Sequence, residues 1–232
     1  MFHFAHLGGD VVGNKYYYKP TTWQGFLQQL EFLIARSGYR YFHVTYYPQQ
    51  KQDKWDKIDQ KLIEKYQTNA TRSQRYRNKQ KKNANFMFLR FDNVAVVLMA
   101  TSKFKGVKTQ VNKDIVIDDD FYDIGTHDLK IELGKMSSYK FHTVGGQITL
   151  SMTNKMYKDI RTKLLEVAQT KNLKQAHYEF NKLNGLPVNK GINQQKFQLL
   201  DVLVDELKRH NVKAKKSSFF VRLTRVKVKV FT

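Results

Sequence analysis

The sequence contains no cysteine and only three prolines among its 232 residues. The absence of cysteine excludes disulfide bonds, thiol catalysis and cysteine-ligated zinc. Apolar runs are short, so the sequence predicts no transmembrane helix and no membrane partner. Residues 1–10 lack a basic segment followed by an apolar one, so we expect no signal peptide and a cytoplasmic protein.

Acidic residues are also scarce: 20 Asp and Glu stand against 41 Lys and Arg, for a formal net charge of +21. A folded protein with this charge repels itself and attracts polyanions, and solubility alone requires far less charge. The imbalance therefore favours nucleic acid as the partner, ahead of an anionic membrane surface. A hydrophobic fraction of 41% indicates a folded protein rather than a basic tail.

The charges are segregated along the chain. Residues 65–91 and 207–232 contain no acidic residue, with eight basic residues in the first stretch and nine in the second. Many of the acidic residues lie between these stretches, in residues 114–132. This pattern predicts one or two basic faces and an acidic patch.

Apolar periodicity predicts an α+β fold. Helices are expected at residues 21–36, 53–67, 154–169, 173–183 and 193–210. Strands are expected at residues 1–7, 39–47, 86–91, 94–101, 128–133, 141–144, 147–152 and 219–231. We expect a single mixed or antiparallel sheet, with helices on one face and a C-terminal helical subdomain.

The predicted domain limits are a core over residues 1–152, a helical subdomain over 153–212 and a basic strand over 213–232 that returns to the core. One single domain is the alternative. In the last strand the apolar alternation changes phase at Thr224 and Arg225. This break predicts a bulge or bend, with Lys227 and Lys229 together on one face.

The strongest motif is residues 71–82 (TRSQRYRNKQKK). Arginine bonds phosphate with two parallel hydrogen bonds, and Tyr76 offers a ring on which a base can stack. As a helix, the segment places Arg72, Arg75, Tyr76 and Lys79 on one face. The predicted nucleic-acid contacts are Arg72, Arg75, Tyr76, Arg77, Lys79, Lys81 and Lys82. The alternative is a solvated basic loop.

Two further segments combine basic with aromatic or β-branched residues. In residues 15–19 (KYYYK), the predicted contacts are Lys15, Tyr17 and Lys19, and these rings together with the aromatic residues of 39–47 could stack on unpaired bases. The alternative is that the tyrosines pack in the core. The C-terminal candidates for phosphate binding are Lys215, Lys216, Arg222, Arg225, Lys227 and Lys229.

The acidic stretch is the place where a metal-dependent reaction is conceivable. Asp118, Asp119 and Asp120 precede Asp128 and Lys130 on a predicted strand. The pattern resembles the PD-(D/E)xK nucleases, in which carboxylates hold Mg²⁺ and a lysine steadies the attacking water or the phosphate. Asp118, Asp120 and Asp128 would be the metal ligands, and Asp120, Asp128 and Lys130 the catalytic candidates. No proline precedes the first aspartate and the gap is short, so the alternative is an acidic turn with a solvated Lys130.

A histidine cluster is the other metal candidate. Rolling-circle initiators use a His-x-His pair with a tyrosine nucleophile, and here His3, His6 and His43 are the histidines in question. The spacing of His3 and His6 places their rings on opposite faces of a strand, which counts against a shared metal. The sequence has no Walker loop, no GxGxxG and no HExxH motif.

Residues 47–66 (YPQQKQDKWDKIDQKLIEKY), 72–91 (RSQRYRNKQKKNANFMFLRF) and 94–101 (VAVVLMAT) resemble an uncharacterised group of basic proteins associated with bacterial plasmids and mobile elements. Residues 173–183 and 198–211 follow the same layout. The resemblance covers most of the chain, implies a role in plasmid or mobile-element biology and identifies no catalytic residue.

Three functional hypotheses follow. The leading one is a non-enzymatic DNA- or RNA-binding protein, an accessory or replication factor of a plasmid or mobile element, with no cofactor. The second is an enzyme, either a Mg²⁺-dependent nuclease or a replication initiator. The third is a ribosomal or other ribonucleoprotein component, which the same charge and aromatic content suggest.

Overall fold

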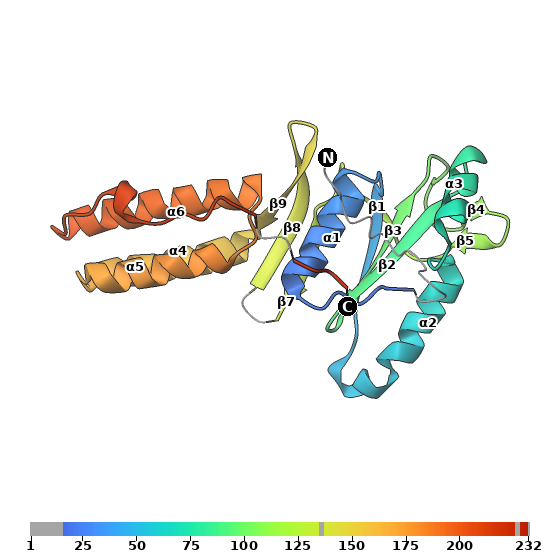
Figure 1. The fold of residues 1–232 in the computed structure, drawn as a ribbon, viewed down its shortest axis with the longest axis horizontal. Helices are drawn as coiled ribbons and strands as arrows, with labels where there is room; N and C mark the ends of the chain where they lie inside the picture. Colours follow the sequence, from blue (N-terminus) through green and yellow to red (C-terminus); the bar gives the residue numbers. More distant parts are fainter. Residues whose placement is uncertain (1–15, 135–136, 226–227, 232) are drawn as a thin grey trace. The chain divides into compact units, whose positions relative to one another are not determined.

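The computed structural model describes residues 16–134, 137–225 and 228–231 (Figure 1). Helices and antiparallel sheets confirm the predicted α+β class. The described residues form two compact units. We call residues 16–129, 145–148 and 228–231 the N-terminal unit, and residues 130–134, 137–144 and 149–225 the helical unit. The domain limits drawn from the sequence at residues 152 and 212 stay a prediction.

The first helix, α1 (Trp23–Ala35), lies within the predicted range 21–36 and begins at a threonine cap. The Thr22 side chain accepts a hydrogen bond of 3.1 Å from the Gly25 backbone amide, which satisfies one of the unpaired amides of the first turn. Phe26, Leu30 and Leu33 recur at helical spacing and form a buried stripe. The helix therefore packs one apolar side against the rest of the N-terminal unit.

The N-terminal unit contains an antiparallel four-stranded sheet in the order β2-β3-β1-β6. Its strands are β1 (Tyr41–Tyr46), β2 (Asn85–Phe91), β3 (Val94–Ala100) and β6 (Tyr122–Asp123). β3 pairs along its whole length with β2 on one side and along most of it with β1 on the other. The apolar run 94–100 is therefore an inner strand of this sheet. A turn at Asp92 joins β2 to β3, with a φ of +50°.

Helices cover both faces of this sheet, which corrects the expectation of helices on one face. Phe86 and Phe88 of β2 point to one face, where they join a core with Trp55 and Ile63. Phe91 points to the opposite face, because side chains alternate along a strand. There its ring lies 6.0 Å from that of Phe26 in α1.

Two helices follow β1. A 3₁₀ segment (Gln49–Lys54) leads into α2 (Trp55–Tyr66), and after a short loop the chain forms α3 (Arg72–Gln80). α3 begins with a capping box, in which Thr71 and Gln74 satisfy each other's backbone amides. A small hairpin, β4 (Thr109–Asn112) and β5 (Ile115–Ile117), contributes Val111 and Ile115 to the core beside α2. This hairpin and β6 were not predicted from the sequence, because strands this short contain too few residues to show an alternation of apolar and polar side chains.

A buried ion pair joins α2 to β2. The Arg90 Nε lies 2.8 Å from both carboxylate oxygens of Asp59, whose side chain is fully buried. Tyr47 donates a hydrogen bond of 3.0 Å to the same carboxylate. At the outer edge, Arg90 and Lys19 both donate to Asp56, at 2.9 and 2.6 Å. The guanidinium also lies over the rings of Trp55 and Tyr47. Both buried charges of this network, on Asp59 and Arg90, therefore have a partner, as burial of charge requires.

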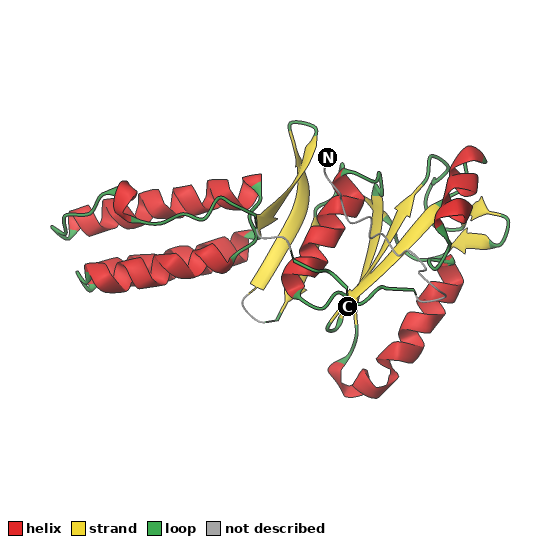
Figure 2. Cartoon of the chain, in the orientation of Figure 1, coloured by secondary structure: helices red, strands yellow, loops and turns green. Residues whose placement is uncertain are grey.

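The helical unit combines a three-stranded sheet with three helices. The sheet has the order β7-β8-β9, formed by β7 (Leu129–Leu133), β8 (Ser137–Val144) and β9 (Gln147–Met152). The helices are α4 (Asn154–Gln169), α5 (Leu173–Asn181) and α6 (Lys190–Arg209), with short 3₁₀ segments at Lys182–Gly185 and Lys216–Ser218. Figure 2 shows α4 and α6 side by side. The predicted limits of α4 are confirmed to the residue, whereas α6 begins three residues earlier than expected.

The start of α6 is held against β9 by side-chain amides. Asn189 caps the helix and also accepts hydrogen bonds from the Leu150 amide and the Thr149 hydroxyl. The Gln195 amide bonds both the N–H and the C=O of Met152. The close approach requires glycine at position 191, because a Cβ there would lie 2.6 Å from the Leu150 carbonyl oxygen.

Two expectations about strands were wrong. The strands were expected to form one sheet, but β7, β8 and β9 form a separate sheet from β1, β2 and β3. Residues 219–225 and 228–231 were expected to be a strand and contain none, so there is no strand bulge at Thr224. The backbone at Phe220 and Arg222 forms hydrogen bonds with the Asn184 side chain instead of with a neighbouring strand. The expected strand at 1–7 and Lys227 lie outside the described residues.

Among the residues that the structure describes, no helix has both the length and the apolar character needed to cross a membrane.

Replacing Asp59 tests the buried ion pair. Asp59→Ala leaves the Arg90 guanidinium buried without its main partner, so we expect a loss of about 3–5 kcal/mol of unfolding free energy. Asp56→Ala removes a carboxylate of the same network whose side chain is 74% exposed, and we expect a loss of less than about 1 kcal/mol. Urea unfolding of both variants checks the difference, and equal losses would contradict it.

Candidate nucleic-acid interface

The helix α3 stands out because none of its residues is buried. Polar contacts hold it in place. The Arg75 guanidinium donates to the Thr68 carbonyl oxygen at 2.9 Å, and the Asn85 amide donates to the Arg75 carbonyl oxygen at 3.0 Å. Asn78 donates to Asn85 at 3.2 Å. One side of α3 is therefore fixed against the start of β2, and the other sides face solvent.

The solvent side of α3 and the turn after it carry unpaired positive charge. We define the α3 basic surface as the exposed residues Arg72, Tyr76, Arg77, Lys79, Lys81 and Lys82. Within the described residues, no ion pair involves any of its five cations. The Tyr76 ring lies among them with 64% of its surface exposed. Residues 72–80 form the helix that was one of the two alternatives for this segment, and its cations are available to a ligand.

Arg75 differs from the other predicted contacts on this helix. It was expected to share a face with Arg72, Tyr76 and Lys79, but its side chain is half-buried against the Thr68 carbonyl. Arg75 thus holds the loop between α2 and α3 in place. Lys103 was not among the predicted contacts, and its Nζ donates to Asn83 at 3.1 Å, close to the end of α3. An isolated lysine gives no pattern in the sequence, so only the fold places it there.

The tyrosines of residues 16–19 pack against the protein. The Tyr16 hydroxyl exchanges hydrogen bonds with the Phe88 backbone, and its burial raises the pKa of the phenol. The Tyr18 ring lies 5.3 Å from that of Phe88, and the Tyr17 ring 6.0 Å from that of Phe231. Lys19 is bonded to Asp56. These contacts favour the core-packing alternative, and Lys15 lies outside the described residues.

The aromatic residues of β1 and its flanks also belong largely to the core. Tyr39, Phe42 and Tyr47 are buried. Tyr46 is 42% exposed and already has a partner. This segment therefore offers little free ring surface for stacking.

The C-terminal candidates are divided between the two units. Lys216 forms an ion pair of 2.7 Å with Asp201 of α6, whereas Lys215, Arg222 and Arg225 are exposed in the helical unit. Lys229 is exposed in the N-terminal unit. Because the expected strand is absent from the described residues, these side chains do not form the continuous line of charge that alternation predicted.

The acidic stretch is largely occupied by ion pairs within the N-terminal unit. Lys65 of α2 lies 2.7 Å from Asp118 and 2.8 Å from Asp119, and the Tyr66 hydroxyl donates to Asp119 as well. Partial burial raises the pKa of Asp119, but the hydrogen bonds from Lys65 and Tyr66 outweigh it and lower that pKa below its ordinary value. Arg40 pairs with Asp123 at 2.7 Å.

The proposed nuclease residues are not brought into a metal site. Asp118 is paired with Lys65, and the Asp120 carbonyl lies 2.9 Å from Nδ1 of His43. Asp128 and Lys130 are exposed at the start of β7. Over residues 16–134, 137–225 and 228–231, no group of three His, Cys, Asp or Glu side chains is arranged to hold a metal ion. His3 and His6 lie outside the described residues, and the nuclease and initiator hypotheses stay predictions.

No protein-family model matches the chain, and neither the curated proteins nor the solved structures give a significant match.

The cluster around Asp119 predicts a pH dependence of stability. Because the folded pKa of Asp119 is lower than its ordinary value of 3.8, its stabilising contribution is complete above that pH and is lost as the pH falls through the folded pKa. The unfolding free-energy difference between the wild type and Asp119→Asn should therefore be constant near neutral pH and shrink below pH 3.8. Urea unfolding across the acid range measures it, and a difference independent of pH would contradict the assignment.

Proposed function

We propose that this protein binds nucleic acid through the α3 basic surface. The observation that carries the proposal is that five exposed cations on and after one helix have no acidic partner in the described part of the chain, and surround an exposed tyrosine. Elsewhere in the N-terminal unit, Lys19, Arg40, Lys65 and Arg90 are each paired with aspartate. Exposed lysines of α2 and its start, such as Lys54, Lys57 and Lys61, also lack an ion pair within the described residues, but Asp53, Asp56 and Glu64 accompany them, whereas no acidic residue lies within residues 65–91 around α3.

The mechanism is the release of counterions from phosphates. α3 has nine residues, so at 1.5 Å per residue it is about 13 Å long and can contact several consecutive phosphates. Each phosphate neutralised on a duplex contributes about 0.9 to the slope of log affinity against log salt. Arg72 and Arg77 can each bond a phosphate with two parallel hydrogen bonds, whereas the lysines act as point charges.

Tyr76 adds a preference for unpaired bases. Its ring is exposed between cations on the same helix, which is the combination that single-strand-binding surfaces use. Stacking on an aromatic ring tolerates every base, so it gives selectivity for single strands without sequence preference. The surface thus suits single-stranded or structured nucleic acid.

The biological role is proposed from the resemblance to plasmid and mobile-element proteins, as an accessory or replication factor. Sequencing the nucleic acid that co-purifies at low salt separates the possibilities. Plasmid or mobile-element DNA would support this role, whereas ribosomal RNA would favour a ribonucleoprotein component.

A charge-matched pair of variants tests the α3 basic surface. Arg72→Gln/Arg77→Gln/Lys79→Gln removes three charges from it, and Lys54→Gln/Lys57→Gln/Lys61→Gln removes three exposed charges from α2 and its start. We expect the α3 variant to lower the salt slope by about one for each phosphate that it no longer neutralises, and the α2 variant to leave the slope close to that of the wild type. Fluorescence anisotropy with labelled oligonucleotides over a salt series measures both slopes.

Equal slopes for the two triple variants would contradict α3 as the binding surface. A wild-type affinity that does not depend on salt would contradict the electrostatic mechanism altogether.

A tyrosine variant tests the stacking contact. Tyr76→Ala should weaken binding to single strands by about 1–3 kcal/mol, the contribution of one base–aromatic stack, and leave duplex binding unchanged. Tyr178→Ala on α5 removes a ring of similar exposure, 66% against 64%, and serves as the control. Competition binding of single-stranded and duplex oligonucleotides measures the effect. An equal loss for both substrates would show that Tyr76 does not stack on unpaired bases.

A further inference from the structure

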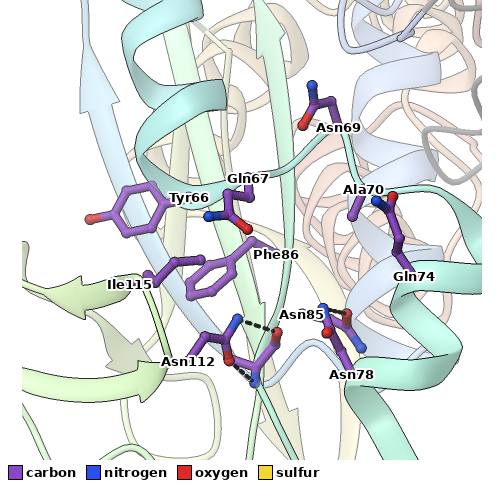
Figure 3. A pocket seen from close by; sticks show the side chains of 11 residues that line it. Tyr66, Gln67, Asn69, Ala70, Gln74, Asn78, Asn85, Phe86, Asn112 and Ile115 are labelled. Atoms are coloured by element: carbon purple, nitrogen blue, oxygen red, sulfur yellow. Dashed lines mark hydrogen bonds between the residues drawn. The ribbon is translucent and has the colours of Figure 1, made fainter.

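A pocket of about 350 Å³ lies on the inner side of α3, and amide side chains dominate its wall (Figure 3). The amides come from the α2–α3 loop, from α3 itself, from the start of β2 and from β4: Gln67, Asn69, Gln74, Asn78, Asn85 and Asn112. Phe86 and Ile115 supply an apolar floor. Among the described residues, no lysine, arginine, aspartate or glutamate lines it. The volume is at the lower end of the range for small-molecule sites, about 300–1,000 Å³.

Part of the amide set is fixed by hydrogen bonds within the protein. Asn112 bonds both the N–H and the C=O of Ala84, at 2.7 and 3.1 Å. Asn85 bonds Arg75 and Asn78, and the Gln74 Oε1 accepts from the Thr71 amide at 2.7 Å. These bonds hold the wall rigid, which lowers the entropy cost of binding a ligand.

The remaining amide groups are available to a ligand. The side chains of Gln67 and Asn69 make no hydrogen bond within the described residues, and the Nε2 of Gln74 makes none either. They offer donors and acceptors on the rim beside α3 (Figure 3). Within the described part of the chain, the wall holds no arginine or lysine to neutralise a phosphate group and no carboxylate to neutralise an ammonium group. The lining therefore selects an uncharged ligand with donors and acceptors on one edge.

We propose that this pocket binds one unpaired nucleobase of the strand held by the α3 basic surface. Asn and Gln amides pair with base edges through a donor and an acceptor together, and unpaired bases present such edges. α3 contributes to both sites, because Gln74 and Asn78 line the pocket while Arg72, Arg77 and Lys79 face solvent. A nucleic-acid strand bound along α3 could thus turn one base into the pocket. The inference rests on the proposed function and adds a base-reading site to it.

The test separates base contacts from phosphate contacts. Wild-type binding to single-stranded homopolymers of each base is compared with binding to an abasic oligonucleotide that has the same number of phosphates. The test variant is Gln67→Gly/Asn69→Ala. Glycine is chosen at position 67 because its φ is +48°, where alanine would be strained. The control, Gln50→Ala/Gln60→Ala, removes two exposed amides outside the pocket.

We expect the wild type and the control variant to prefer at least one homopolymer over the abasic strand. The pocket variant should bind that homopolymer about five- to 140-fold more weakly, the range for one amide–base pair, with the salt slope unchanged. An unchanged preference in the pocket variant would overturn the base site and leave the proposed function standing. A wild type that binds abasic and base-containing strands equally would overturn both the base site and the Tyr76 stack, and would leave electrostatic binding through the α3 basic surface standing. Absence of salt-dependent binding to every strand, abasic included, would overturn both.

Discussion

The N-terminal unit depends on the buried pair between Asp59 and Arg90. α2 supplies the carboxylate and β2 supplies the guanidinium, and neither charge can stay in the core without the other. Tyr47 and Asp56 complete the hydrogen bonds of the pair, and Lys19 extends it to the surface. The Arg90 Nε is shared between both carboxylate oxygens of Asp59, and because each buried charge needs its partner nearby, the pair constrains how α2 packs on β2.

The position of α3 follows from that arrangement. α3 has no buried residue of its own, so the hydrophobic effect contributes little to its placement. It is instead held by its short connection to α2 and by Asn78, Asn85 and the Arg75 guanidinium, which join it to the start of β2 and to the preceding loop. A helix held in this way can devote nearly all of its side chains to a ligand. Two of the residues in these tethers, Asn78 and Asn85, also line the amide-rich pocket.

The parts of the fold that the sequence predicted well are those in which one pattern extends over many residues. α4 combines an apolar stripe with a threonine cap, and β3 is a continuous apolar run that only a central strand accommodates. At residues 219–231, the alternation of apolar and polar residues predicted a strand that the described residues do not form. Phe219 packs on Phe180 in the helical unit, whereas Phe231 is buried in the N-terminal unit, so the segment satisfies apolar contacts in two places without strand pairing. The short hairpin β4–β5 offered no comparable pattern.

A basic residue in an acid-free stretch of the sequence is not always free to bind a ligand in the folded protein. The acid-free stretch 65–91 includes Lys65 and Arg90, yet both are paired with aspartates that lie at least 31 positions away along the chain. The sequence could not reveal those partners, because the packing of helix α2 against β2 and against the loop after β5 brings them together. The cations of α3 remain unpaired because their helix projects from the sheet, where no acidic strand or loop of the described chain reaches them. Exposure on a helix without buried residues, rather than the density of basic residues alone, is therefore what distinguishes the cations of α3 from Lys65 and Arg90.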